Sequence, residues 1–96
     1  MKLYKSKKPF FSVITVVKND EKNIEKTIKS ILNQNFKNFE YLIIDGKSVD
    51  NTLVNIKKFK KKINFIKSSK DKGIYFAVNK GAKVAKGDVV VFVNSG

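Results

Sequence analysis

Four polar segments follow apolar runs in this sequence, and they carry the side chains best suited to chemistry. These segments are Lys18-Asn19, Asp45, residues 70–73 and Asn94-Ser95-Gly96. The chain contains neither cysteine nor histidine, which excludes thiolate and imidazole metal ligands and every Ser-His or Cys-His nucleophile pair. A metal ion would therefore have to bind oxygen, and a bound phosphate would need lysine or a cation held on carboxylates to neutralise it.

The polar segments can act together only if the fold brings them to one place. Four β-branched, apolar runs are typical of strands buried on both faces: residues 11–17, 41–44, 63–66 and 89–93. Apolar residues recur at helical spacing in the intervals between them: residues 24–32, 53–59 and 73–86. The order βαβαβαβ requires parallel pairing with right-handed crossovers. It predicts a Rossmann-like α/β domain with a mostly parallel four-stranded sheet.

The carboxyl ends of the strands are where such a sheet binds ligands, and each polar segment falls at one of these ends. A dinucleotide-binding turn needs glycines between the first strand and its helix, but residues 18–23 contain none. No glycine-rich turn ending in Gly-Lys-Ser/Thr follows any strand, which excludes a Walker phosphate loop. The sequence therefore predicts a ligand site at this edge that is built without a glycine-rich turn.

The charge of the chain is strongly basic. Its 96 residues carry a formal net charge of +13, and every basic residue is a lysine. Without arginine, bidentate recognition of phosphate or guanine is missing. Three explanations stay open: a compositional bias, contact with an anionic membrane surface, and contact with nucleic acid.

The sequence also bears on where the protein is located. No apolar run is long enough to span a membrane. Residues 1–10 form a basic lead without a secretory signal. We therefore expect a cytoplasmic protein.

Several separated blocks of the sequence occur in the order and spacing of a known family. They are residues 11–21, 30–34, 39–52, 71–81 and 86–95. Together they resemble the opening of the family 2 glycosyltransferases, over about residues 11–96. The resemblance implies a partial domain of the GT-A fold across 11–96 that binds a nucleotide-diphosphate sugar, usually a uridine one.

The resemblance also assigns roles to particular residues. It places Val16 and Lys18 around the base and ribose, makes Asp45 an acceptor for the base, and sets Asp71 beside the nucleotide. A carboxylate at a strand end can accept the imide N–H of uracil. Each aspartate also has a structural alternative, because Asp45 precedes a glycine turn and Asp71 could cap the helix that follows it.

Two aspartates and one asparagine are assigned structural roles. Asp50 is expected to cap the second helix and Asp88 to lie in a turn before the last strand. Asn19 is expected to cap the first helix rather than contact a ligand.

The metal motif of the family is degenerate in this sequence. Family members bind Mn or Mg through an acidic DxD-type motif, which here falls on Asn94-Ser95-Gly96. Glycine stands at Gly96, where the aspartate that ligates the cation is expected. Asn94 and Gly96 are therefore the candidate metal positions, and the missing carboxylate predicts weak binding of a divalent cation.

The resemblance implies an enzyme that transfers a sugar to a glycan or lipid-linked acceptor, cytoplasmic or at the inner face of the cell membrane. No catalytic residue is predicted in this chain, because the family places its general base and acceptor site beyond the equivalent of Gly96. The alternatives are an inactive truncated remnant of such an enzyme and a lysine-rich module for anionic surfaces or nucleic acid. Because the sheet ends on the apolar strand 89–93, we also expect the chain to be marginally stable or to associate.

Overall fold

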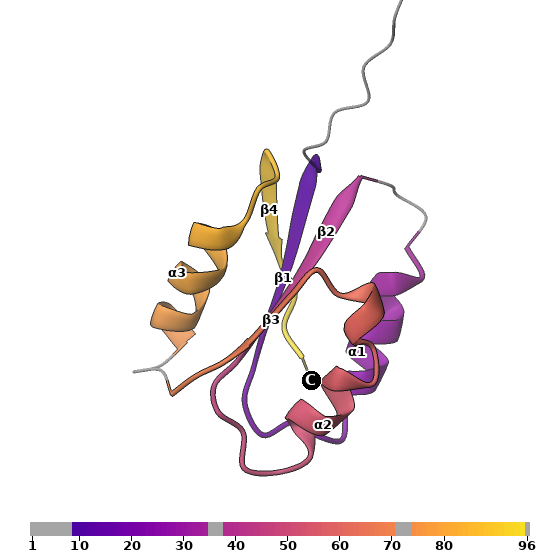
Figure 1. Ribbon diagram of the computed structural model, residues 1–96, viewed down its shortest axis with the longest axis vertical. Coiled ribbons are helices and arrows are strands. Elements are labelled where there is room, and N and C mark those ends of the chain that lie inside the picture. Colours follow the sequence, from indigo (N-terminus) through magenta and orange to yellow (C-terminus); the bar gives the residue numbers. More distant parts are fainter. Residues whose placement is uncertain (1–8, 35–37, 71–73, 96) are drawn as a thin grey trace, which may run out of the picture.

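A computed structural model describes residues 9–34, 38–70 and 74–95 and shows one parallel sheet between two layers of helix (Figure 1). The elements in chain order are β1 (Phe11–Val17), α1 (Ile24–Leu32), β2 (Phe39–Asp45), α2 (Thr52–Lys57), the 3-10 turn η1 (Lys60–Lys62), β3 (Phe65–Ser68), α3 (Ile74–Val84) and β4 (Val89–Phe92). The strand order is β3-β2-β1-β4, and all three pairs are parallel. The predicted α/β class and four-stranded parallel sheet are confirmed.

The sheet has an apolar core on each face. Alternate residues of β1 and β2 pack against α1 and α2 on one face, where the buried residues are Val13, Val17, Ile24, Ile28, Ile31, Tyr41, Ile43, Ile56 and Ile63. On the other face, Ile14, Leu42 and Ile44 pack with Ala77 of α3. The continuous apolar runs of β1 and β2 therefore exist because helices cover both of their faces.

Helix α3 lies close against β1 at Gly81. A Cβ atom at this position would lie 2.8 Å from Cγ2 of Ile14. Glycine lowers the intrinsic stability of the helix, but the absence of a side chain lets the backbone of α3 approach the sheet.

Two predicted boundaries differ from the structure. Strand β3 covers Phe65–Ser68 rather than residues 63–66, because Asn64 interrupts the ladder: its side-chain carbonyl accepts the N–H of Tyr41 at 2.8 Å. The second helix ends at Lys57, and the lysine run that was expected to stop it forms the separate turn η1.

The turn between α3 and β4 is fixed to the amino edge of the sheet. The buried Glu40 carboxylate accepts the Ser12 hydroxyl at 2.6 Å and the Lys86 N–H at 2.5 Å. The Gly87 N–H in turn donates to the Ser12 hydroxyl at 2.8 Å. We call this cluster of Ser12, Glu40, Lys86 and Gly87 the amino-edge lock.

Strand β4 forms one edge of the sheet and is exposed. Its four residues, Val89 to Phe92, keep between 38% and 45% of their surface accessible among the described residues. In the part of the chain that the structure describes, no helix is long and apolar enough to cross a membrane.

Candidate functional site

The carboxyl ends of the strands meet at one edge, as predicted, since the pairs align Val17 with Asp45 and Asp45 with Ser68. The β1–α1 loop, the β2–α2 loop and the segment after β4 therefore lie side by side. We call this the carboxyl edge. Hydrogen bonds between side chains of these segments organise it.

Asp45 is the centre of the carboxyl edge. Its side chain is fully buried. One carboxylate oxygen accepts the Ser48 hydroxyl at 2.5 Å, and the other accepts the Ser48 N–H at 3.0 Å and the Ser68 hydroxyl at 2.8 Å. Asp45 thus closes the turn after β2 and ties it to β3, which is the structural role weighed for it. An ionised carboxylate has about four acceptor positions, and three of them accept these donors.

Val16 lies on β1, next to the strand that carries Asp45, and Lys18 directly follows β1. The two residues differ in exposure. The stem of Lys18 lies against Gly46, where an added Cβ would be 3.4 Å from Cβ and Cδ of the lysine. The exposed Lys18 therefore crosses the end of β2. Val16 is half-buried and packs against the core on the α3 face. Asp71, the fourth predicted nucleotide residue, lies outside the described residues.

Asn19 joins two loops instead of capping a helix. Its backbone has a φ of 51°, in the left-handed region that asparagine tolerates. Its N–H donates to the Ser48 hydroxyl at 2.8 Å, and its side-chain carbonyl accepts the Val49 N–H at 2.8 Å. The residue at the N-cap of α1 is Asn23. The expected cap at Asn19 is therefore wrong, because the chain makes another turn before the helix begins.

Asp20 is a residue of the carboxyl edge that the sequence did not single out. Its carboxylate accepts the Ser95 hydroxyl at 2.6 Å and the Asn23 side-chain amide at 3.0 Å. Its N–H donates to the Thr52 hydroxyl at 2.7 Å. The only local signal was an acidic residue directly after the first strand, which is also typical of a helix start.

Asp50 has a structural role at the start of α2, but the N-cap residue is Asn51 rather than Asp50 as expected. One oxygen accepts the N–H of Thr52 at 2.9 Å and its hydroxyl at 2.5 Å, and the other accepts the Glu21 N–H at 3.3 Å. The Thr52 hydroxyl, followed by these backbone donors, lowers the pKa of Asp50. Asp50 therefore fixes the start of α2 against the β1–α1 loop.

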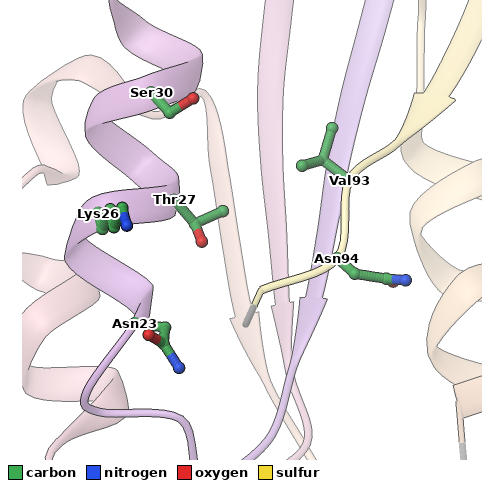
Figure 2. Close-up of a pocket in the computed structure, with 6 residues that line it drawn as sticks. All are labelled: Asn23, Lys26, Thr27, Ser30, Val93 and Asn94. Carbon is green, nitrogen blue, oxygen red and sulfur yellow. The ribbon is translucent and has the colours of Figure 1, made fainter.

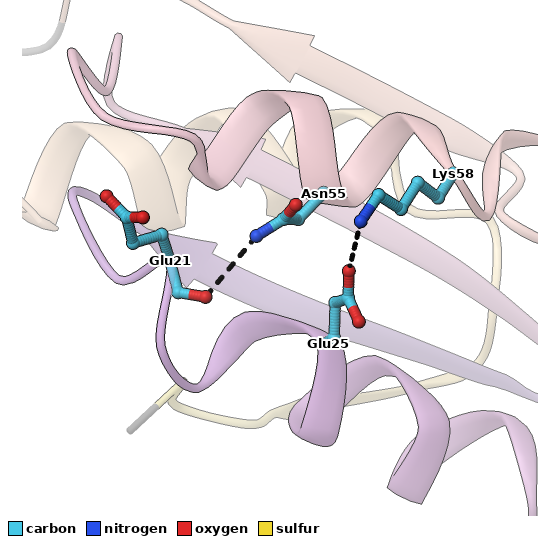
Figure 3. Close-up of polar contacts among 4 residues, drawn as sticks. All are labelled: Glu21, Glu25, Asn55 and Lys58. Atoms are coloured by element: carbon cyan, nitrogen blue, oxygen red, sulfur yellow. Dashed lines mark hydrogen bonds and ion pairs between the residues drawn. The ribbon is translucent and has the colours of Figure 1, made fainter.

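Helices α1 and α2 are also joined at the surface, as Figure 3 shows. Lys58 pairs with Glu25 at 2.8 Å, and the Asn55 side-chain amide donates to the Glu21 carbonyl at 3.3 Å. The hydrogen bond from Lys58 is the main cause that lowers the pKa of Glu25. Because the pair is exposed, it adds little stability, and it maintains the register of the two helices.

The described residues do not fit a divalent cation. They contain no group of three or more acidic side chains that could hold a metal ion. Asn94 is exposed and offers one neutral amide oxygen, while Gly96 lies outside the described residues and has no side chain. A divalent cation prefers several oxygen ligands, carboxylates among them, so this part of the chain lacks the donor set that the family motif implies.

A polar hollow of about 290 Å³ lies between α1 and the segment after β4. Figure 2 shows its lining, which comprises Asn23, Lys26, Thr27, Ser30, Val93 and Asn94. In this view Val93 points toward α1, whereas Asn94 points to the opposite side. The sequence could not predict this hollow, because it joins residues of the first helix to residues after the last strand.

Known proteins share both the sequence and the fold. A glucuronosyltransferase of Methanococcus voltae, named as acting on dolichyl N-acetyl-alpha-D-glucosaminyl phosphate, is 40% identical over 88 residues, which cover 85% of this chain and 27% of the relative. The crystal structure of residues 1–349 of S. aureus TarS in complex with UDP superposes with a TM-score of 0.79 at 33% identity, over 90% of this chain and 27% of that TarS chain.

A more distant structure has the same fold. The mannosyltransferase PcManGT of Pyrobaculum calidifontis, in complex with GDP-Man and Mn²⁺, has a TM-score of 0.82 at 21% identity, over 91% of this chain and 27% of that one. The chain thus spans about a quarter of the length of the Methanococcus voltae relative and of the chains in these two structures. Residues 12–95 match the family described as "Glycosyl transferase family 2", and with the parallel sheet and its organised carboxyl edge the chain belongs to this family.

Proposed function

We propose that this chain binds a nucleotide-diphosphate sugar, specifically a UDP-sugar, at the carboxyl edge. The observation that carries the proposal is the pre-organised turn around the buried Asp45, with the stem of Lys18 across Gly46. A site that is already ordered before binding loses less entropy when the ligand arrives. The UDP complex of TarS, at 33% identity, supports uridine as the base.

Each proposed contact has a physical reason. We propose that the Asp45 carboxylate accepts the imide N–H of uracil, which requires Ser48 or Ser68 to move aside because the carboxylate is fully buried. Val16 and the alkyl stem of Lys18 lie beside the base and ribose in this proposal. The ammonium group at the end of that stem reaches the diphosphate and neutralises it, and this charge is its main contribution to affinity. Asp71 is proposed beside the nucleotide.

Donor binding is tested by calorimetric titration of the chain with UDP, UDP-glucose and uridine. We expect Lys18→Ala to lower the affinity for UDP about tenfold, since one charge-assisted contact is lost, and to change the affinity for uridine little. Lys29→Ala, an exposed lysine in the last turn of α1, is the matched control. A folded chain that does not bind UDP would refute the proposal.

The role of a divalent cation is tested in the same titration. The mannosyltransferase PcManGT, which shares the fold, was solved with Mn²⁺, and the resemblance assigns the metal motif to Asn94 and Gly96. Because the described residues lack the carboxylates that would hold the ion, we expect added Mn²⁺ or Mg²⁺ to change the affinity for UDP by less than about twofold. A tenfold increase with Mn²⁺ would contradict this and place the ion on residues outside the described part.

We propose that these 96 residues bind the donor without transferring its sugar. Inverting transfer needs a carboxylate free to act as general base within reach of the acceptor hydroxyl. Three carboxylates of this edge, on Asp20, Asp45 and Asp50, already accept protein donors. The rate at which UDP-glucose is cleaved to UDP should be the same with the chain as in buffer alone. A chain that binds UDP but does not cleave UDP-glucose fits this proposal, whereas an inactive remnant that binds nothing would show neither.

We further propose that the whole enzyme serves a glycan or lipid-linked acceptor at the cytoplasmic face of the membrane. The dolichyl-linked acceptor in the name of the Methanococcus voltae relative supports the acceptor class. A second observation is the lysine patch, which consists of Lys57, Lys58, Lys60, Lys61 and Lys62 around the half-buried Phe59. A lysine near an anionic bilayer contributes about 1 kcal/mol.

Vesicle binding tests the membrane part of this proposal. Chain binding to phosphatidylglycerol vesicles should fall on the order of a hundredfold when Lys60, Lys61 and Lys62 are all replaced by glutamine. Replacing Lys22, Lys26 and Lys29 removes the same charge elsewhere and should have a smaller effect. Equal losses in both triple variants would indicate a composition effect, and tighter binding to RNA than to vesicles would favour the nucleic-acid alternative.

A further inference from the structure

The segment after β4 is held by a side chain rather than by the sheet. The backbone ladder between β1 and β4 continues to the Val93 N–H, which donates to the Ile14 carbonyl at 2.9 Å. Beyond it, the Ser95 hydroxyl donates to the Asp20 carboxylate at 2.6 Å, across 75 positions of sequence. The direction of residues 94–95 is therefore set from the β1–α1 loop.

Asp20 is well placed to hold this segment because it is itself fixed by neighbouring residues. Its second carboxylate oxygen accepts the Asn23 side-chain amide at 3.0 Å. Its N–H donates to the Thr52 hydroxyl at 2.7 Å, and its carbonyl accepts the N–H groups of Asn23 and Ile24. Asp20 thus joins the starts of α1 and α2 to the end of β4.

The position of this segment relative to Asp45 matches the extent of a nucleotide. Neighbouring strands lie about 4.8 Å apart, and β1 separates β2 from β4. Phe92 of β4 and Leu42 of β2 are both aligned with Ile14, so the two strands are about 10 Å apart at that level. A uracil bound at Asp45 would direct its diphosphate across Lys18 and toward Asn94 and Ser95.

We infer that Asp20 is a positioning residue for the diphosphate end of the donor site, acting through Ser95. The inference rests on the proposed binding of UDP. Direct contact between Asp20 and phosphate is unfavourable because both are anionic, and both carboxylate oxygens are engaged by Ser95 and Asn23. Asp20 instead holds residues 94–95 beside the phosphates, and its own charge is satisfied by hydrogen bonds.

The test compares Asp20→Ala, Ser95→Ala and the double variant with wild type. We expect each single variant to lower the affinity for UDP about tenfold and to leave the affinity for uridine unchanged. The double variant should bind UDP no more weakly than either single one, because both remove the same interaction. Asp20→Asn keeps an acceptor oxygen and should recover part of the loss.

Asp50→Ala is the matched control, since it removes another hydrogen-bonded carboxylate from the same edge without touching β4. Asp50→Ala should lower the stability of the fold and leave the ratio of UDP affinity to uridine affinity unchanged. A variant that acts only through stability can therefore be distinguished from one that acts on the diphosphate. Additive losses in the double variant, or an unchanged ratio in Asp20→Ala, would overturn the role of Asp20.

A second measurement does not depend on the ligand. Backbone ¹⁵N relaxation should show residues 94–95 more mobile in Asp20→Ala than in wild type, and not in Asp50→Ala. Unchanged order in Asp20→Ala would overturn the inference even if UDP binds. A wild-type chain that binds neither UDP nor uridine would overturn the proposed function together with this role, whereas wild-type binding with an unchanged ratio would overturn the role alone.

Discussion

At the scale of single residues, the sheet encloses polar pairs whose partners lie far apart in the sequence. The Tyr41 hydroxyl is buried and lies 2.9 Å from the Thr15 hydroxyl. Burial raises the pKa of Tyr41 to about 12, against a smaller opposing effect of the hydrogen bond to Thr15. The apolar run of β1 contains Thr15 because this partner satisfies its hydroxyl.

The raised pKa of Tyr41 predicts how stability depends on pH. The unfolded chain ionises this tyrosine near its ordinary pKa of about 10, whereas the folded chain holds the proton up to about pH 12. The contribution of Tyr41 is therefore complete below pH 10 and is lost as the pH rises from 10 to 12. Urea denaturation of wild type and of Tyr41→Phe across this pH range measures the contribution of Tyr41. The lysines titrate in both proteins, so their effect cancels in the difference.

Tyr41→Phe should cost about 1 kcal/mol at pH 8, because the Thr15 hydroxyl loses its partner. The difference between the two proteins should shrink and then change sign as the pH rises from 10 to 12, because a two-unit pKa shift corresponds to about 2.7 kcal/mol. If the difference in unfolding free energy between the two proteins stayed constant across this pH range, burial would not raise the pKa of Tyr41.

At the scale of elements, β4 is placed by its flanking turns as well as by its ladder. The amino-edge lock fixes the turn before it, and Asp20 fixes the segment after it. Gly87 has no room for a side chain, since a Cβ would lie 2.7 Å from the backbone of Phe11 and Ser12. The Lys86-Gly87-Asp88 turn therefore needs glycine for a close approach.

Gly87→Ala should destabilise the fold by about 2 kcal/mol, as overpacking against a backbone does. Gly46→Ala is a suitable comparison, because its nearest contact is 3.4 Å, to the flexible Lys18 stem. Its cost should be clearly smaller in urea denaturation. If both substitutions lowered the free energy of unfolding equally, the backbone around the amino-edge lock would be able to shift and accommodate a side chain at Gly87.

Hydrophobic periodicity predicted the elements well because it is a local property of the chain. The runs at 11–17 and 89–93 and the helical spacing of Ile24, Ile28 and Ile31 correspond to observed elements. The start of β3 was missed because the Asn64 side chain replaces a backbone acceptor, which no periodicity reveals. The roles of Asp20 and Glu40 were missed because their partners lie 75 and 46 positions away.

At the scale of the whole molecule, the chain has one well-buried half and one open edge. The sheet is covered on both faces around β1 and β2, whereas β4 exposes the apolar residues Val89 to Phe92 and one unpaired side. An exposed apolar edge strand is a template for pairing with another strand. The isolated chain should therefore associate as its concentration rises.

Val91→Lys should reduce this association, because a lysine on an edge strand disfavours pairing. Val54→Lys is the control, since Val54 is 59% exposed on α2, away from the strand edge. Sedimentation velocity over a range of concentrations checks both. A wild-type chain that stays monomeric throughout would refute the prediction.

The two long-range attachments of β4 also bear on how the chain folds. The bonds from Gly87 to Ser12 and from Ser95 to Asp20 each close a loop of 75 positions, whereas the β1–β2 ladder joins residues only 28 positions apart. Closing a longer loop costs more chain entropy before any contact forms. The β1–α1–β2 unit should therefore assemble first, with β4 joining it last, so the donor site is completed in the final step of folding.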